Sequence, residues 1–137
     1  MNYTDIISKW KEKKIDSIEK LDQQLSNFRI TFAYNSGTIE NPQITYHATR
    51  EVFENGKVIN FCGDTQTIFE IENQKKCYNF LVPKIINKDP ITSDLIKKIH
   101  YQLMQGVYDE HRWQKGERPG HYKIHDYVIG KSNQGAL

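Results

Sequence analysis

Apolar residues recur at helical spacing through the first third of the chain, and this repeat constrains the fold more than any other feature. The residues Ile18, Leu21, Leu25, Phe28 and Phe32 are separated by three, four, three and four positions. Such spacing places side chains along one stripe of an α-helix. Thr4 and Asp5 can cap its start. We therefore predict a long helix over residues 4–34, about 45 Å in length at ~1.5 Å per residue.

Three further helices are predicted from capping residues and glycine terminators. Their N-cap candidates are Thr45, Asp64 or Thr65, and Thr92 or Ser93. Gly56 ends the first of these helices and Gly106 ends the last, because glycine readily adopts the left-handed conformation found after a helix. Apolar residues surround much of the middle helix, so we expect it to be buried on more than one side.

The sequence after Gly106 loses helical periodicity and predicts a β-hairpin. Turn-forming residues occupy 116–120, and aromatic and β-branched residues follow until Gly130. The expected fold class is therefore mainly α with one β-hairpin. We expect a single domain over residues 1–137, with the long helix in 1–41, core helices in 42–106 and the hairpin in 117–130.

Charge and hydropathy limit the classes of partner. Nineteen Lys and Arg against seventeen Asp and Glu leave a net charge of +2, so no nucleic-acid partner is expected. A helical nucleic-acid binder acting through Lys9–Lys14 is the weakest alternative, since Glu12 and Asp16 are interleaved with these lysines. No segment has the length of apolar sequence needed for a membrane span, and the N-terminus does not resemble a signal peptide. We expect a cytoplasmic protein without a membrane partner.

Familiar catalytic and metal-binding motifs are absent from the sequence. Neither phosphate-binding glycine pattern occurs, and we assign no catalytic residue. His121 and His125 have the spacing of a helical metal pair, but they fall in the predicted hairpin with no third ligand nearby. We therefore predict no metal site. His100 follows the core residue Ile99 and is interpreted as a helix-packing histidine.

A short motif links the end of the long helix to a known family. Ser36, Glu40 and Asn41 match the pattern [ST]-x-x-x-E-[GN], which resembles the inhibitory motif of Fic-type protein adenylyltransferases. Further segments resemble that family in the same order, at 42–45 with 49–52, Asn73, 96–106, 119–123 and 128–130. Lys123 stands where the family usually has arginine. The resemblance covers residues 28–130 and implies a Fic-like helical domain whose hairpin is the flap.

The resemblance implies an activity and a set of site residues. The family are nucleotidyltransferases that transfer AMP from ATP, with Mg²⁺, to a Ser, Thr or Tyr hydroxyl of a protein target. Glu40 would hold the enzyme in an autoinhibited state by pairing with an arginine of the active loop. The flap would bind the target segment by strand addition through Tyr122, Lys123, Ile124, Val128 and Ile129.

The family's active loop, H-x-F-x-[DE]-G-N-G-R, does not occur in this sequence. ATP and Mg²⁺ would bind only together with that catalytic part, and we expect this chain alone to bind neither and to be inactive. The alternative is a non-catalytic regulatory module that presents Glu40 to a catalytic partner chain. The family's later helices would normally cover the core, so we expect this chain to expose apolar surface where they are missing. Such a surface favours self-association into a homo-oligomer.

Overall fold

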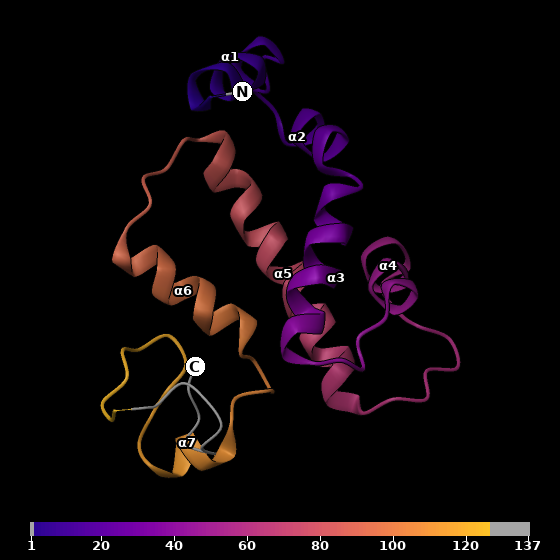
Figure 1. Ribbon diagram of the computed structural model, residues 1–137, viewed down its shortest axis with the longest axis vertical. Coiled ribbons are helices and arrows are strands. Elements are labelled where there is room, and N and C mark those ends of the chain that lie inside the picture. The colour runs from indigo at the N-terminus through magenta and orange to yellow at the C-terminus, as the bar shows by residue number, and fades with distance from the viewer. Residues whose placement is uncertain (1, 127–137) are drawn as a thin grey trace.

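The structure is a computed structural model in which residues 2–126 are described. These residues form seven helices and no strand (Figure 1). The helices are α1 Tyr3–Glu12, α2 Ile18–Leu25, α3 Phe28–Glu40, α4 Tyr46–Asn55, α5 Thr65–Ile86, α6 Ser93–Leu103 and α7 Glu110–Gln114. The mainly-α class is thus confirmed. Over the described range, no helix is both long and apolar enough to cross a membrane.

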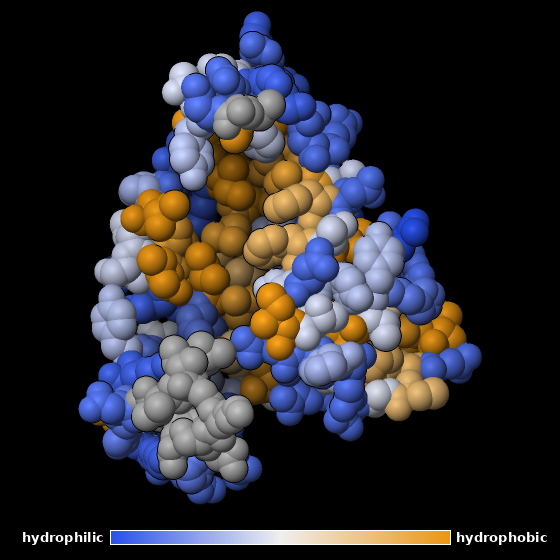
Figure 2. Space-filling view, viewed as in Figure 1, coloured by the Kyte–Doolittle hydropathy of each residue, from blue (hydrophilic) through white to orange (hydrophobic). Residues whose placement is uncertain are grey.

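Helix α5 is the central element of the fold. It packs against α2, α3 and α4 on one side and against α6 on the other (Figure 1). The core lies where α3, α4 and α5 meet, and its buried members are Ile30, Ala33, Ile44, Ala48, Val52, Phe53 and Ile71. Figure 2 shows apolar side chains along the furrow between α6 and α3, above α5.

The prediction of one helix over residues 4–34 is wrong, because the chain breaks twice in this range. Lys14 adopts a left-handed conformation with a φ of 49°, which an α-helix cannot accommodate. Ser17 then begins α2, its side chain accepting a hydrogen bond from the backbone N–H of Lys20 at 3.2 Å. A second break at Ser26 and Asn27 separates α2 from α3. The apolar stripe from Ile18 to Phe32 continues across the second break, which is why spacing alone did not reveal that break.

Helix α3 continues beyond the predicted end and includes Ser36, Gly37 and Glu40. Gly37 is buried there because Ile44 packs directly against it. A Cβ atom at Gly37 would lie 2.9 Å from Cδ1 of Ile44, which is too close for an ordinary contact. The glycine thus serves close packing inside the helix and does not interrupt it.

The predicted caps of the later helices are confirmed. Thr45 and Thr92 are the N-caps of α4 and α6, and each side chain accepts a backbone N–H of the first turn. Asp64 is the N-cap residue of α5. Gly56 ends α4 in the left-handed conformation, with a φ of 77°.

The predicted flap hairpin is not seen in the part of 117–130 that is described. Residues 117–126 form turns and bends. The carboxylate of buried Glu117 accepts the backbone N–H groups of Ile124 and His125, each at 3.0 Å. These two donors therefore bond to a side chain and not to a neighbouring strand. Val128 and Ile129, the other predicted flap residues, lie outside the described residues.

Candidate functional site

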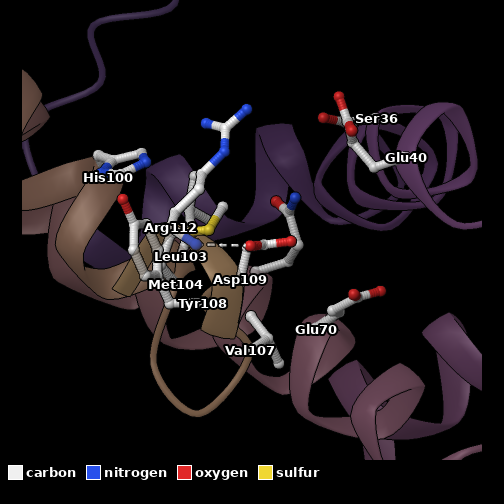
Figure 3. Close-up of a pocket in the computed structure, with 11 residues that line it drawn as sticks. Ser36, Glu40, Glu70, His100, Leu103, Met104, Val107, Tyr108, Asp109 and Arg112 are labelled. Carbon is white, nitrogen blue, oxygen red and sulfur yellow. Dashed lines mark hydrogen bonds between the residues drawn. The ribbon is translucent and has the colours of Figure 1, made fainter. Parts of the chain in front are cut away.

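A pocket of about 620 Å³ lies between α3, α5, α6 and α7 (Figure 3). This volume is within the range of about 300–1,000 Å³ typical of small-molecule sites. Ser36 and Glu40 of α3 lie on one side of it, and His100 of α6 lies on the other. The Arg112 guanidinium of α7 is directed into the space between them (Figure 3).

The acidic side of the pocket is built by the last turn of α3 and the first turns of α5. Ser36 and Glu40 are four residues apart on α3, which places them on the same helix face. Glu70 of α5 lines the pocket below them. Glu40 is exposed to solvent, so its carboxylate is accessible to a ligand or to another chain.

Asn41, the residue after Glu40, fixes this side of the pocket. Its Nδ2 donates hydrogen bonds to Oε2 of Glu70 at 2.8 Å and to Oγ1 of Thr67 at 3.0 Å. Its Oδ1 accepts the backbone N–H of Gln43 at 3.0 Å. The three fixed positions of the [ST]-x-x-x-E-[GN] motif thus differ in their contacts. Ser36 and Glu40 line the pocket, whereas Asn41 joins the end of α3 to α5.

The opposite side of the pocket is formed by α6 and the short α7. Asp109 caps α7, its Oδ1 accepting the backbone N–H of Arg112 at 2.8 Å (Figure 3). This cap stabilises the first turn of the helix that carries Arg112. The lining between the two sides is apolar and comes from Leu103, Met104 and Val107. A ligand in the pocket would therefore contact an apolar surface between an acidic and a basic end.

His100 makes a specific hydrogen bond that the packing interpretation did not include. Its Nδ1 accepts the backbone N–H of Gly120 at 2.9 Å. Burial lowers the pKa of His100, and the positive charges of Arg112 and Lys123 lower that pKa further. The neutral ring is favoured, and because Nδ1 is an acceptor the ring proton must be on Nε2.

The predicted flap residues Tyr122, Lys123 and Ile124 lie in the segment that follows Gly120. Lys97 Nζ of α6 lies 4.3 Å from the centroid of the Tyr122 ring. Tyr122 and Lys123 line a second cavity next to His100, while Glu117 binds the backbone of Ile124. The structure therefore brings part of the predicted flap close to α6, but without strand geometry.

Several pocket residues were missed from the sequence. Arg112 lies in a five-residue helix, which is too short for periodicity to detect, although Asp109 followed by Glu110 is a typical helix start. Glu70 could have been found, because it precedes Asn73 by three positions and completes the E-x-x-N pattern of the resemblance. Among the described residues, no group of three His, Cys, Asp or Glu side chains could hold a metal ion.

No protein-family model, curated protein or solved structure matches this chain. The function is therefore inferred from the geometry of the pocket and from the resemblance of the motifs.

Proposed function

We propose that this chain is the N-terminal part of an autoinhibited Fic-type protein adenylyltransferase, with Glu40 as its inhibitory carboxylate. One observation carries the proposal. Ser36 and Glu40, chosen from a sequence motif alone, line the same pocket from the last turn of α3. An inhibitory carboxylate must reach a nucleotide-sized cavity, and the volume of about 620 Å³ is sufficient for that role.

The hydrogen bonds around Asn41 support this role, because an inhibitory group must be held in position. Asn41 joins the end of α3 to Thr67 and Glu70 of α5. Glu40, one residue earlier, can then present a carboxylate to an arginine brought by an active loop. A carboxylate–guanidinium pair is charge-assisted and bidentate, so Glu40 competes with a phosphate for that arginine.

The described residues do not fit a complete ATP and Mg²⁺ site. Phosphate-binding glycines and a metal-holding acidic group belong to the active loop, which this sequence does not contain. Glu40, Glu70 and Asp109 line the pocket, but among the described residues no group of three His, Cys, Asp or Glu side chains is placed to hold a metal ion. The contribution of this chain is therefore to position and inhibit, and we derive no transfer step from its residues.

A second candidate function is a regulatory module that presents Glu40 to a catalytic partner chain. The exposure of apolar residues beside the motif favours it. Ile39 is 80% exposed, and Phe28 and Phe32 on the same helix are 58% and 57% exposed. Ile39 adjoins Glu40, while Phe28 and Phe32 lie twelve and eight residues before it on α3. Exposed apolar side chains on the helix that carries an accessible carboxylate are typical of a surface that another protein covers.

The test measures transfer of label from ATP, labelled in its α-phosphate, to protein in the presence of Mg²⁺. It compares the 137-residue chain with the chain extended by any reading-frame continuation beyond Leu137. Each is prepared with Glu40 intact, as Glu40→Gly, as Glu40→Gln and with the control Glu12→Gln on α1. Strong labelling only in the extended Glu40 variants supports the proposal, because both substitutions remove the inhibitory charge.

The other outcomes separate the two candidates. Transfer by the isolated 137 residues would contradict the inactivity that we expect of them. Absence of transfer from every extended chain would overturn the adenylyltransferase proposal. Inhibition of a co-purified catalytic chain, lost in Glu40→Gln and retained in Glu12→Gln, would establish the regulatory module instead.

A further inference from the structure

Helix α1 has an apolar face that packs against no other helix of the described residues. Tyr3, Ile6, Ile7 and Trp10 have the spacing that places side chains on one face of a helix, and they are 85%, 49%, 52% and 41% exposed. The helix has only 10 residues, and isolated helices shorter than about 12–15 residues are marginally stable in water. An apolar partner surface would therefore stabilise α1.

The furrow between α3 and α6 is a second apolar surface, and its walls follow from the pocket of the candidate site. Ser36 of α3 and His100 of α6 lie on opposite sides of that pocket (Figure 3). Phe28 and Phe32 precede Ser36 by eight and four positions, and Ile96 precedes His100 by four. Residues four apart share a helix face, so these three side chains line the furrow that Figure 2 shows as apolar.

The floor of the furrow is the second half of α5. Gln74 lines the pocket, and Leu81 and Ile85 follow it by seven and eleven positions, which correspond to about two and three turns of helix. Leu81 is half-buried and Ile85 is 46% exposed. The five apolar side chains that form the furrow are Phe28, Phe32, Leu81, Ile85 and Ile96.

Helix α1 matches the furrow in length and in charge. Its 10 residues extend about 15 Å, and the α3 wall from Phe28 to Glu40 extends about 18 Å. Lys9 and Lys11 border the apolar face in the last turn of α1, whereas Glu12 lies on the opposite face. Glu40 is exposed at the pocket end of the furrow. Opposite charges therefore favour the direction in which the last turn of α1 lies beside Glu40.

This direction excludes the furrow of the same chain. The last turn of α1 is joined to α2 by residues 13–17, and these five residues span at most about 18 Å when fully extended. Helix α2 lies at the end of α3 that is farther from the pocket (Figure 1). The linker would have to return over the whole furrow, about 18 Å, and then continue to the start of α2. A second copy of the chain can supply the helix without this constraint.

We propose that α1 of one copy packs in the furrow of a second copy, and that the two copies exchange their α1 helices. Every copy carries both surfaces, so the exchange is reciprocal and gives a closed two-fold dimer with both furrows filled. Removal of apolar area from water at both contacts drives the association. The dimer goes beyond the proposed function, because it needs neither a nucleotide nor an active loop. It is measured by mass, so it and the labelling experiment can fail separately.

Sedimentation velocity of the 137-residue chain over a concentration series tests the proposal, and we expect a monomer–dimer equilibrium. Ile6→Asp should raise the dimer dissociation constant at least about tenfold, since it puts an unpaired charge into an apolar contact. Ser8→Asp adds the same charge to the polar face of α1 and should leave the constant nearly unchanged. In the furrow, Phe32→Asp should weaken the dimer as Ile6→Asp does, whereas Thr31→Asp, an exposed change on the same helix, should not.

Mixing the Ile6→Asp and Phe32→Asp chains tests the exchange itself. The Phe32→Asp chain keeps an intact α1 and the Ile6→Asp chain keeps an intact furrow, so a mixed dimer recovers one of the two contacts. We expect heterodimers at concentrations at which each variant alone is monomeric. Circular dichroism checks the folding of each variant, and Ile7→Asp or Phe28→Asp replaces one that misfolds.

Four outcomes would overturn the proposal. A monomer at every concentration would remove the dimer, and protection of the α1 amides from hydrogen exchange in that monomer would place α1 in its own furrow. A dimer that both Ile6→Asp and Phe32→Asp leave intact would form through another surface. A mixture without heterodimers would exclude the exchange. Binding of a monomer to anionic phospholipid vesicles, lost in Ile6→Asp, would assign the apolar face of α1 to a membrane surface instead.

Discussion

The side chains of Asn41 and Glu70 join α3 to α5 at the edge of the main pocket. Nδ2 of Asn41 donates to Oε2 of Glu70 at 2.8 Å, while Oε1 of Glu70 accepts from Nε2 of Gln66 at 3.1 Å. The same Asn41 amide donates to the hydroxyl of Thr67, which is fully buried. The helix end that carries Glu40 is thereby fixed to the central helix of the fold.

Replacing Asn41 by alanine is expected to destabilise the protein. Asn41→Ala removes the donor that Thr67 and Glu70 both use, so the free energy of unfolding should fall by about 1–3 kcal/mol. Urea unfolding followed by circular dichroism measures this change. The control is Asn35→Ala on the exposed part of α3, where a change within about 0.5 kcal/mol is expected. Equal effects of the two substitutions would contradict a fixed helix end.

Asn73 makes a second connection, between α5 and the end of α6. Its buried Nδ2 donates to the carbonyl oxygens of Leu103 at 3.1 Å and Gln105 at 2.7 Å. Asn73→Asp places an acceptor against these two acceptors, so we expect a loss of unfolding free energy larger than the about 1–3 kcal/mol of Asn73→Ala. Denaturant titration compares both with Asn79→Asp, an exposed change on the same helix. If Asn73→Asp lowered the free energy of unfolding no more than Asn79→Asp does, the side-chain amide of Asn73 would not be needed for stability.

Local signals in the sequence predicted most of the helical fold. Thr45 and Thr92 begin helices and Gly56 ends one, as predicted. These positions could be predicted because a helix cap depends mainly on the few residues next to it in the sequence.

The break at Ser26 and Asn27 was missed because the apolar stripe from Ile18 to Phe32 continues through it. The stripe does not report whether the backbone between two turns is continuous. It also identified the core-facing side poorly, because Leu21 is buried but Ile18, Phe28 and Phe32 are 43%, 58% and 57% exposed.

The candidate site was predictable only in part, for a related reason. Ser36 and Glu40 share one helix, so their spacing alone placed them on one face. Arg112 reaches the pocket from a five-residue helix, which is too short to leave a periodic pattern. Glu117 was assigned to a hairpin, but its buried carboxylate binds two backbone N–H groups seven and eight residues away. β-Propensity does not reveal that a side-chain carboxylate will bind the backbone N–H groups that a neighbouring strand would otherwise accept.

Tyr78 should titrate late and make the protein less stable in strong alkali. Burial and the hydrogen bond to Asp22, at 2.8 Å, raise the pKa of Tyr78 to about 12. Below about pH 10 the phenol is protonated in both folded and unfolded chains, so its stabilising contribution is complete. That contribution should decrease as the pH rises from about 10 to about 12, as the unfolded chain loses the proton first. Ultraviolet titration of the phenolate, compared with Tyr78→Phe, measures the late-titrating group, and a normal tyrosine profile would contradict it.

His100 should make the protein sensitive to mild acid. Its pKa is lowered by burial and by the facing cations Arg112 and Lys123, so the folded state resists protonation. Above about pH 6.5 the ring is neutral in both states, and its contribution to stability is complete. As the pH falls below that value, the unfolded chain binds the proton first and the contribution decreases. Protonation also turns Nδ1 into a donor, which breaks its bond with the N–H of Gly120.

The measurement for His100 compares the free energy of unfolding of the protein with that of His100→Gln across a pH series. Gln does not titrate, so the advantage of the native protein should shrink between about pH 7 and about pH 5. NMR of the Gly120 amide should show a change over the same range, because this amide loses its acceptor when the ring is protonated. A constant difference in stability, or a Gly120 amide that ignores pH, would show that the ring and Gly120 are not coupled.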